Sequence, residues 1–209
     1  MLKLRVEFKE LQKKDYKTAI RFAVKGMHFD WYLENKILLN LYGRYFWYQQ
    51  LNRATQIVSA YVGDRLVGIL LADMNGEEKT HRSFGKVLYE KLFDLLQKKF
   101  CKGPAGLYEE TMKQMVKEYA KQNRPDGKIC FLATDPKAKM RGVGSMMLLE
   151  LEKREPGKTV YLHTDDACVY QFYEKRGFDR VCETEIELNT KTKQIPLKCF
   201  VYSKKLWEG

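Results

Sequence analysis

The segment from Ile129 to Arg176 constrains the fold more than any other part of the chain. Apolar patterns typical of strands and of helices alternate along it. They predict strands over 129–134 and 159–164 and helices over 142–155 and 167–176. Two strands joined by a helix lie parallel, with the helix packed on the sheet, because such a crossover cannot form a hairpin. The sequence therefore predicts an α/β fold with a parallel pair of strands at its centre.

The remaining strands are expected to extend this sheet in antiparallel fashion. Residues 2–8 alternate between apolar and charged, which predicts a first strand with one buried face. Residues 55–62 and 66–72 flank Gly63-Asp64 and predict a β-hairpin. Two more strands are expected over 182–188 and 198–203, and helices over 16–27 and 33–51. The whole is a mixed sheet flanked by helices.

Residues 76–126 are expected to form a helical hairpin inserted between strands. Apolar residues recur there at helical spacing in two stripes, separated by Gly103-Pro104: Phe84, Leu88, Leu92, Leu95 and Leu96, then Tyr108, Met112, Met115 and Tyr119. We expect these stripes to pack on each other and on the rest of the domain or a second subunit, which leaves a homodimer open. A chain of 209 residues with 44% apolar content predicts one domain over 1–209.

Composition argues against several classes of protein. The longest apolar runs fall far short of the roughly 18 residues that cross a bilayer, and no secretory signal is recognisable, so we expect a cytoplasmic protein without a membrane partner. Five scattered cysteines without a Cys-x-x-Cys pair disfavour disulfides and a metal site. The net charge of +11 attracts anions, but basic and acidic residues are interleaved, so no nucleic acid partner is expected.

One stretch combines the end of a strand with the start of a helix. Leu132-Ala133-Thr134 ends the strand, Pro136 turns the chain away, and Gly142 and Gly144 open the helix. The first N–H groups of a helix have no internal partner and carry partial positive charge, so this junction suits a phosphate group. By itself, Gly-x-Gly is equally typical of a helix start that needs flexible residues.

Two motifs resemble those of the GNAT superfamily of acetyl-CoA-dependent N-acetyltransferases. The first is similar to the coenzyme A loop Gln/Arg-x-x-Gly-x-Gly/Ala, with lysine in its first position: Lys139-Met140-Arg141-Gly142-Val143-Gly144. The second, from Asp166 to Phe178, resembles Asn-x-x-Ala-x-x-Phe-Tyr-x-x-x-Gly-Phe, with Asp166 replacing asparagine and Val169 replacing alanine. The resemblance is specific over 129–178 and only topological elsewhere.

This resemblance implies a GNAT-like three-layer fold whose two central strands splay apart, with acetyl-CoA between them. The implied coenzyme contacts are Leu132, Ala133, Thr134, Lys139, Met140, Arg141, Gly142, Val143, Gly144, Ser145, Asp166, Val169 and Phe172. Backbone N–H groups would stabilise the oxyanion that forms when an amine attacks the thioester. Tyr173 matches the superfamily's general acid, which protonates the departing thiolate.

The general base and the acceptor site are less clearly marked. His163 is the candidate base because its ordinary pKa suits proton transfer near neutrality, but a core or surface histidine shows the same pattern. Glu34, Asp135, Asp165 and a water chain are weaker alternatives. In the superfamily the first helices wall the acceptor site, which implies acceptor contacts from Asp30, Trp31, Tyr32 and Glu34. The aromatic residues from Tyr42 to Tyr48 belong either to that site or to the core.

Together these expectations describe an enzyme that moves an acetyl group from acetyl-CoA to a primary amine of a small molecule or peptide. A GNAT-like module that binds acyl-CoA without turnover is one alternative, and the presence of Tyr173 and both glycines argues against it. An acyl or aminoacyl transferase with an RNA-linked substrate is another, which the scattered charge disfavours. The sequence does not identify the acceptor.

Overall fold

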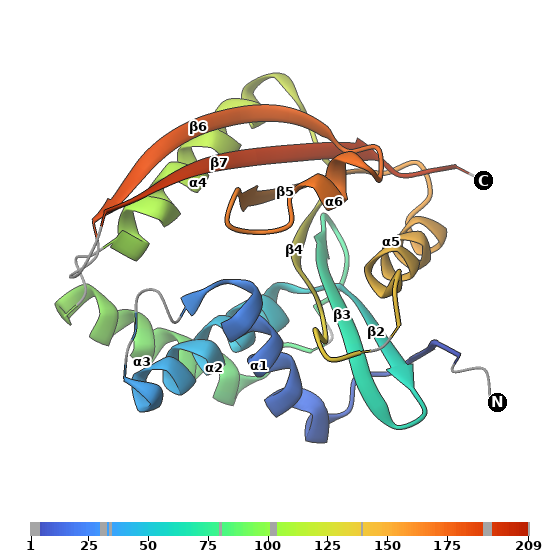
Figure 1. Ribbon diagram of the computed structural model, residues 1–209, viewed down its shortest axis with the longest axis horizontal. Coiled ribbons are helices and arrows are strands. Elements are labelled where there is room, and N and C mark those ends of the chain that lie inside the picture. Colours follow the sequence, from blue (N-terminus) through green and yellow to red (C-terminus); the bar gives the residue numbers. More distant parts are fainter. Residues whose placement is uncertain are drawn as a thin grey trace.

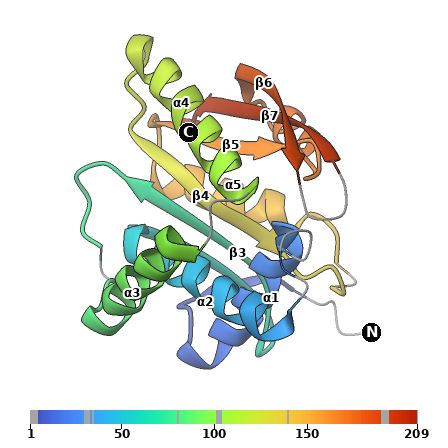
Figure 2. The same cartoon turned by 90° about the vertical axis from the view of Figure 1, so that its left-hand side faces the viewer.

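The computed structural model describes residues 5–29, 33, 35–79, 81–100, 104–138, 140–189 and 194–208, which contain one seven-stranded sheet (Figures 1 and 2). The strands are β1 (Glu7–Lys9), β2 (Gln56–Val62), β3 (Arg65–Met74), β4 (Gly127–Thr134), β5 (Thr159–Asp165), β6 (Asp179–Asn189) and β7 (Gln194–Lys205). Their order is β1-β2-β3-β4-β5-β7-β6, and only β4 and β5 pair in parallel. The predicted mixed sheet with a parallel centre is confirmed.

Helices cover both faces of the sheet. After the 3-10 turn η1 (Lys13–Asp15), α1 (Tyr16–Gly26) and α2 (Lys36–Arg53) lie on one face, and α5 (Val143–Arg154) lies on the other (Figure 1). The side chain of Asn35 starts α2 by accepting hydrogen bonds from the amides of Ile37 and Leu38 at 2.9 and 3.2 Å. No helix in the described ranges is long and apolar enough to cross a membrane.

Alternation along β2 and β3 divides their apolar side chains between the two helical layers. Leu70 packs in the core that contains Met147 of α5, whereas Leu71 packs in the core that contains Trp47 and Leu51 of α2. Trp47 is fully buried in this second core. For Trp47, the core interpretation of the aromatic run is therefore correct.

The insertion contains two helices as predicted, α3 (Phe84–Phe100) and α4 (Pro104–Gln122), but their packing differs from the prediction. In the described part of the chain, α3 lies along α2 while α4 lies on β6 and β7, so the two helices do not pack on each other (Figures 1 and 2). Met112, Met115 and Tyr119 of α4 are buried against β5, β6 and β7. The two helices of the insertion thus cover different parts of the molecule, α3 the helix α2 and α4 the strands β6 and β7.

The expected buried face of α3 is wrong. Leu88 and Leu92 are 45% and 54% exposed, and the opposite side of the helix faces α2. There the rings of Phe93 and Tyr45 stack with centroids 4.5 Å apart, and the Tyr45 hydroxyl donates to Asp94 at 2.5 Å. The aromatic side chains of α2 decide which face of α3 is covered, and the spacing within α3 carries no information about them.

The helix predicted over 167–176 is shorter, and α6 comprises only Gln171–Glu174. The cause is Asp165, whose Oδ1 accepts hydrogen bonds from the amides of Ala167 and Cys168 at 3.1 and 3.2 Å. Such a turn satisfies backbone donors in a non-helical conformation and so competes with the helix.

Candidate active site

The parallel strands β4 and β5 separate soon after they begin. They pair only at Gly127 with Val160 and at Lys128 with Tyr161, yet the strands continue to Thr134 and Asp165. Beyond this point β4 keeps its pairing with β3, and β5 keeps its pairing with β7. Each strand therefore has one open edge, and the two edges face each other across a gap that lacks a backbone partner. The expected splay is confirmed.

A β-bulge in β4 changes which side chains point to each face of the sheet beside this gap. Leu71 pairs with Phe131 and Ala72 with Ile129, so Cys130 is the extra residue. As a result, Cys130 and Phe131 both point to the α1 and α2 face, while Leu132 returns to the α5 face and Ala133 to the α1 face.

The start of α5 offers free backbone donors. Gly142 precedes the helix with φ 84°, a left-handed conformation that favours glycine, and no side chain caps the helix. The first intrahelical bond in this turn is that of Met146 N to Gly142 O at 3.0 Å, so the amides of Val143, Gly144 and Ser145 precede the bonded part of the helix. Three adjacent donors at a positive helix end form an arrangement suited to a phosphate.

Gly144 has a packing role that the sequence did not reveal. A Cβ at this position would lie 3.2 Å from Phe172 Cζ and 3.6 Å from Leu132 Cδ2. Gly144 is buried, unlike the exposed Gly142, so a larger residue at position 144 would disturb the packing there. The close approach brings Phe172, Gly144 and Leu132 together at the gap, as the two motifs imply.

Tyr173 lies on the α5 side of the sheet, where its ring contacts Phe172, Phe178 and Tyr202. Its hydroxyl makes no hydrogen bond to any described residue. Burial is the main cause that raises its pKa well above the ordinary value, and nearby Cys168 adds to the shift. The side chain therefore holds its proton throughout the neutral range.

His163 lies on β5 and points to the face opposite Leu162, towards α2 and α4. Its Nδ1 atom is buried and has no hydrogen-bond partner among the described residues. Burial is the main cause that lowers the pKa of His163 to about 3, and the positive charge of Lys128 contributes to this shift. The imidazole is therefore neutral near pH 7. Tyr173 and His163 lie on opposite faces of the sheet.

The two carboxylates proposed as weaker bases are held by other groups. Asp135 is paired with Arg65 and accepts a hydrogen bond from the amide of Lys137. Asp165 accepts a hydrogen bond from the hydroxyl of Tyr108 at 2.8 Å, in addition to its two backbone donors. Tyr108 belongs to α4, so the insertion contacts the end of β5, and no pattern in the sequence indicates this contact.

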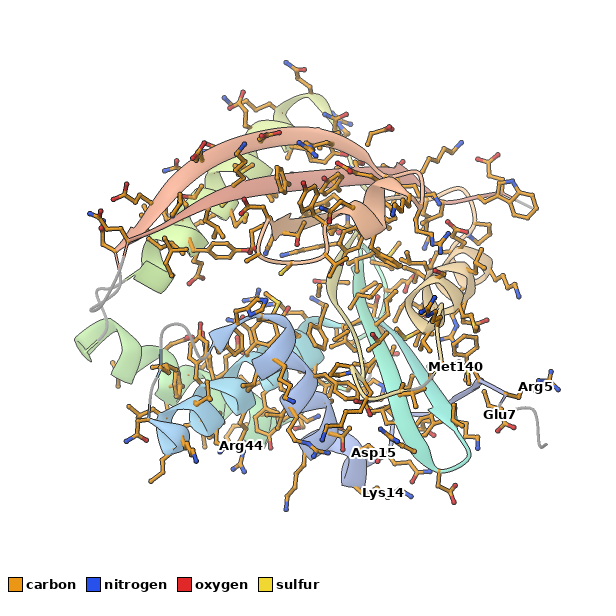
Figure 3. All side chains as sticks on the ribbon, viewed as in Figure 1. Arg5, Glu7, Lys14, Asp15, Arg44 and Met140 are labelled. Atoms are coloured by element: carbon orange, nitrogen blue, oxygen red, sulfur yellow. The ribbon has the colours of Figure 1, made fainter. Side chains whose placement is uncertain are left out.

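The remaining predicted coenzyme contacts are spread around the loop. Met140 packs against the core beneath α5 (Figure 3), whereas Arg141, Thr134 and Val169 are exposed and Ser145 is half-buried. Asp166 Oδ1 accepts a hydrogen bond from the amide of Lys198 at 3.0 Å, which ties the loop to β7. The predicted sites at Lys139, Asp30, Trp31, Tyr32 and Glu34 lie outside the described residues.

Comparison with known proteins supports the fold through solved structures. No family model and no curated protein matches the chain. Among solved structures, the chain is similar to the ribosomal-protein-S18-alanine N-acetyltransferase from Escherichia coli, with 12% identity, a TM-score of 0.53 and coverage of 98% of this chain and 96% of that chain. It is also similar to a protein from Desulfovibrio desulfuricans described as an acetyltransferase of the GNAT family, with 14% identity, a TM-score of 0.50 and coverage of 97% and 99%.

A third similar structure is an agmatine N-acetyltransferase, with 10% identity, a TM-score of 0.56 and coverage of 95% of this chain and 99% of that chain. Coverage is nearly complete in all three, so the likeness in fold extends over almost the whole chain. The chain has the fold of the GNAT N-acetyltransferases, and the recognition made from its two motifs is confirmed at the level of the fold.

Proposed function

We propose that the protein is an acetyl-CoA-dependent N-acetyltransferase that acts on a primary amine of a small molecule or peptide. One juxtaposition carries the proposal: the open edge of β4 leads to the uncapped start of α5, where Leu132 lies beside Gly144. Two of the similar structures are named as N-acetyltransferases of agmatine and of a ribosomal-protein alanine, and these names favour the same chemistry.

The residues at the gap fit acetyl-CoA, which supplies an acyl group activated as a thioester. The open edge of β4 offers backbone N–H and C=O groups to an extended amide-containing chain. The amides of Val143, Gly144 and Ser145 would donate hydrogen bonds to a phosphate group of the coenzyme. Phe172 packs closely against Gly144, so this part of the loop has no space for a side chain at position 144.

In this proposal the Tyr173 hydroxyl gives its proton to the sulfur that leaves. Its raised pKa makes it a weaker acid than an exposed phenol, but the same environment also disfavours a thiolate. The neighbouring thiol of Cys168 shows this, because burial raises its pKa to about 12. Donor and acceptor shift in the same direction, so the transfer depends on their difference and not on the pKa of Tyr173 alone.

His163 is the proposed base, acting from the opposite face of the sheet. Its low pKa keeps Nδ1 or Nε2 unprotonated at pH 7, and its unpartnered Nδ1 is free to accept a hydrogen bond. A base with so low a pKa removes a proton weakly. Its main contribution in this proposal is to accept a hydrogen bond from an amine that arrives already neutral.

The test is release of free thiol from acetyl-CoA in the presence of a panel of primary amines. We expect turnover that depends on the amine. Tight binding of acetyl-CoA with no turnover across the panel would instead identify a module that binds acyl-CoA without catalysis. Turnover only with aminoacyl-tRNA or another RNA-linked amine would identify the RNA-dependent alternative.

A further inference from the structure

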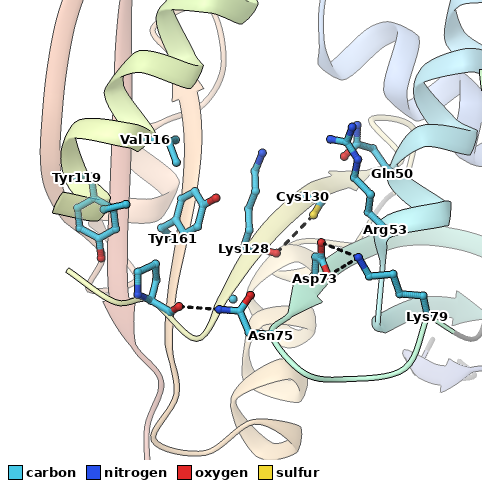
Figure 4. A pocket seen from close by; sticks show the side chains of 13 residues that line it. Gln50, Arg53, Asp73, Asn75, Lys79, Val116, Tyr119, Lys128, Cys130 and Tyr161 are labelled. Atoms are coloured by element: carbon cyan, nitrogen blue, oxygen red, sulfur yellow. Dashed lines mark hydrogen bonds and ion pairs between the residues drawn. The ribbon is translucent and has the colours of Figure 1, made fainter. Parts of the chain in front are cut away.

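A cavity of about 560 Å³ lies where β4 and β5 begin to separate, on the face of the sheet that α2 and α4 cover. Its walls come from α2, β3, β4, α4 and β5, and Figure 4 shows their side chains around the opening. Lys128 and Cys130 extend from β4, Tyr161 from β5, and Gln50 and Arg53 from α2. This is the face opposite the one on which α5 begins.

Cations outnumber carboxylates in this cavity. Asp73 is the one carboxylate among its described lining residues, and Lys79 Nζ lies 3.5 Å from it. Arg53 and Lys128 make no ion pair and no side-chain hydrogen bond to any described residue. In Figure 4 both side chains extend into the same open space, with the hydroxyl of Tyr161 directed towards Lys128.

Neither of the two cations has an ion-pair partner among the described residues, because the one lining carboxylate, Asp73, is paired with Lys79. Burial is the main cause that lowers the pKa of Lys128, and the charge of Arg53 acts in the same direction, whereas Cys130 and Asp73 act against it. An anion between Arg53 and Lys128 would be attracted by both and would offset their mutual repulsion. The guanidinium is a planar fork and the ammonium a point donor, a pair that suits the oxygens of a carboxylate or a phosphate.

We propose that this cavity binds an anionic group, a carboxylate or phosphate, carried by the acceptor whose amine is acetylated. This inference rests on the proposed function for the amine. Lys128 and Tyr161 form the last paired register between the strands, and His163 follows Tyr161 on the same face. The cavity therefore lies at the closed end of the gap, beside the candidate base.

The distance along β4 sets the size of the acceptor. The five residues from Lys128 to Leu132 span roughly 13 Å of strand, so an anion at Lys128 and an amine near Leu132 are separated by several bonds. The acceptor is thus an amine with a distant anionic group, such as an ω-aminocarboxylate or an aminoalkyl phosphate. A long polyamine without an anion would place a second positive charge against Arg53 and Lys128.

The first experiment measures kcat/KM for matched acceptors by thiol release. Straight-chain ω-aminocarboxylates and aminoalkyl phosphates of increasing length are compared with alkylamines of the same length. We expect a preference for the anionic member of about ten- to hundredfold at the best length, as for a charged hydrogen-bonded group. The relative preference for carboxylate or phosphate identifies the group. Lys128→Met should reduce the preference to about one, whereas Lys121→Met, on the exposed surface of α4, should keep it.

A second measurement does not depend on turnover. Binding of hexanoate and inorganic phosphate is followed by calorimetry in the wild type, Lys128→Met and Lys121→Met, with circular dichroism to verify folding. At least one probe should bind more weakly to folded Lys128→Met by about tenfold. Equal binding to all three proteins would overturn the subsite. Equal kcat/KM values for alkylamines and for anionic acceptors would also overturn the subsite, but they would support acetyl transfer. Anion binding lost in Lys128→Met with no amine acetylated would refute the enzyme but keep the anion site.

Discussion

Acid should destabilise the folded protein through His163. Its pKa is about 3 in the folded protein against an ordinary value of 6.5, so the unfolded chain binds one more proton at intermediate pH. Stability then rises with pH through the window from about 3 to 6.5 and is lost as the pH falls. Between pH 8 and pH 5, these two values correspond to a loss of about 2 kcal/mol from this side chain.

The assay is urea unfolding of the wild type and His163→Leu at pH 8 and pH 5. Leucine cannot be protonated and has no nitrogen that needs a hydrogen-bond partner. The free energy of unfolding of His163→Leu should therefore lack the pH-dependent contribution of His163. The difference between wild type and variant should change by about 2 kcal/mol, or roughly 1 M in urea midpoint, between the two pH values. Other titrating groups, including His81, contribute equally to both proteins and cancel. If the difference is the same at both pH values, His163 is not buried as the structure has it.

Three further outcomes are expected. Tyr173→Phe should lower kcat by about 10²- to 10⁴-fold with little change in acetyl-CoA affinity, and an unchanged kcat would leave Tyr173 as a packing residue. Ser145→Glu should weaken acetyl-CoA binding in calorimetry without lowering stability, because a carboxylate is favourable at a helix start but repels phosphate. Leu149→Glu, exposed on the same helix, is the control, and equal affinities of the two variants would contradict the phosphate site. Met112→Ala should lower the free energy of unfolding in urea by about 2–5 kcal/mol, whereas Leu92→Ala should change it by no more than about 0.5 kcal/mol. Comparable losses in the two variants would contradict the observed packing of α3 and α4.

Several features of this protein are determined by short stretches of sequence. The positions of most helices and strands follow from apolar periodicity and from turns such as Gly63-Asp64, whose glycine has φ 59°. Gly142 has the left-handed conformation that a glycine before a helix permits. The order of strand, helix and strand after Gly127 required a parallel pair, because no other connection fits a crossover helix. These signals act over a few residues, so they can be interpreted without a partner elsewhere in the chain.

Tertiary structure decided the rest, because the deciding contacts join residues far apart in the sequence. The side of α3 that is covered depends on Tyr45 of α2, and the length of α6 depends on how Asp165 uses its carboxylate. Gly144 is needed where Phe172 approaches it, which neither residue indicates alone. Arg53 and Lys128 are ordinary surface cations in the sequence, and only the tertiary fold places them in one cavity, whose one carboxylate among the described lining residues is paired with Lys79. Periodicity indicates which face of an element is apolar. It does not indicate which other element packs on that face, or which charged residues lie close together in the fold.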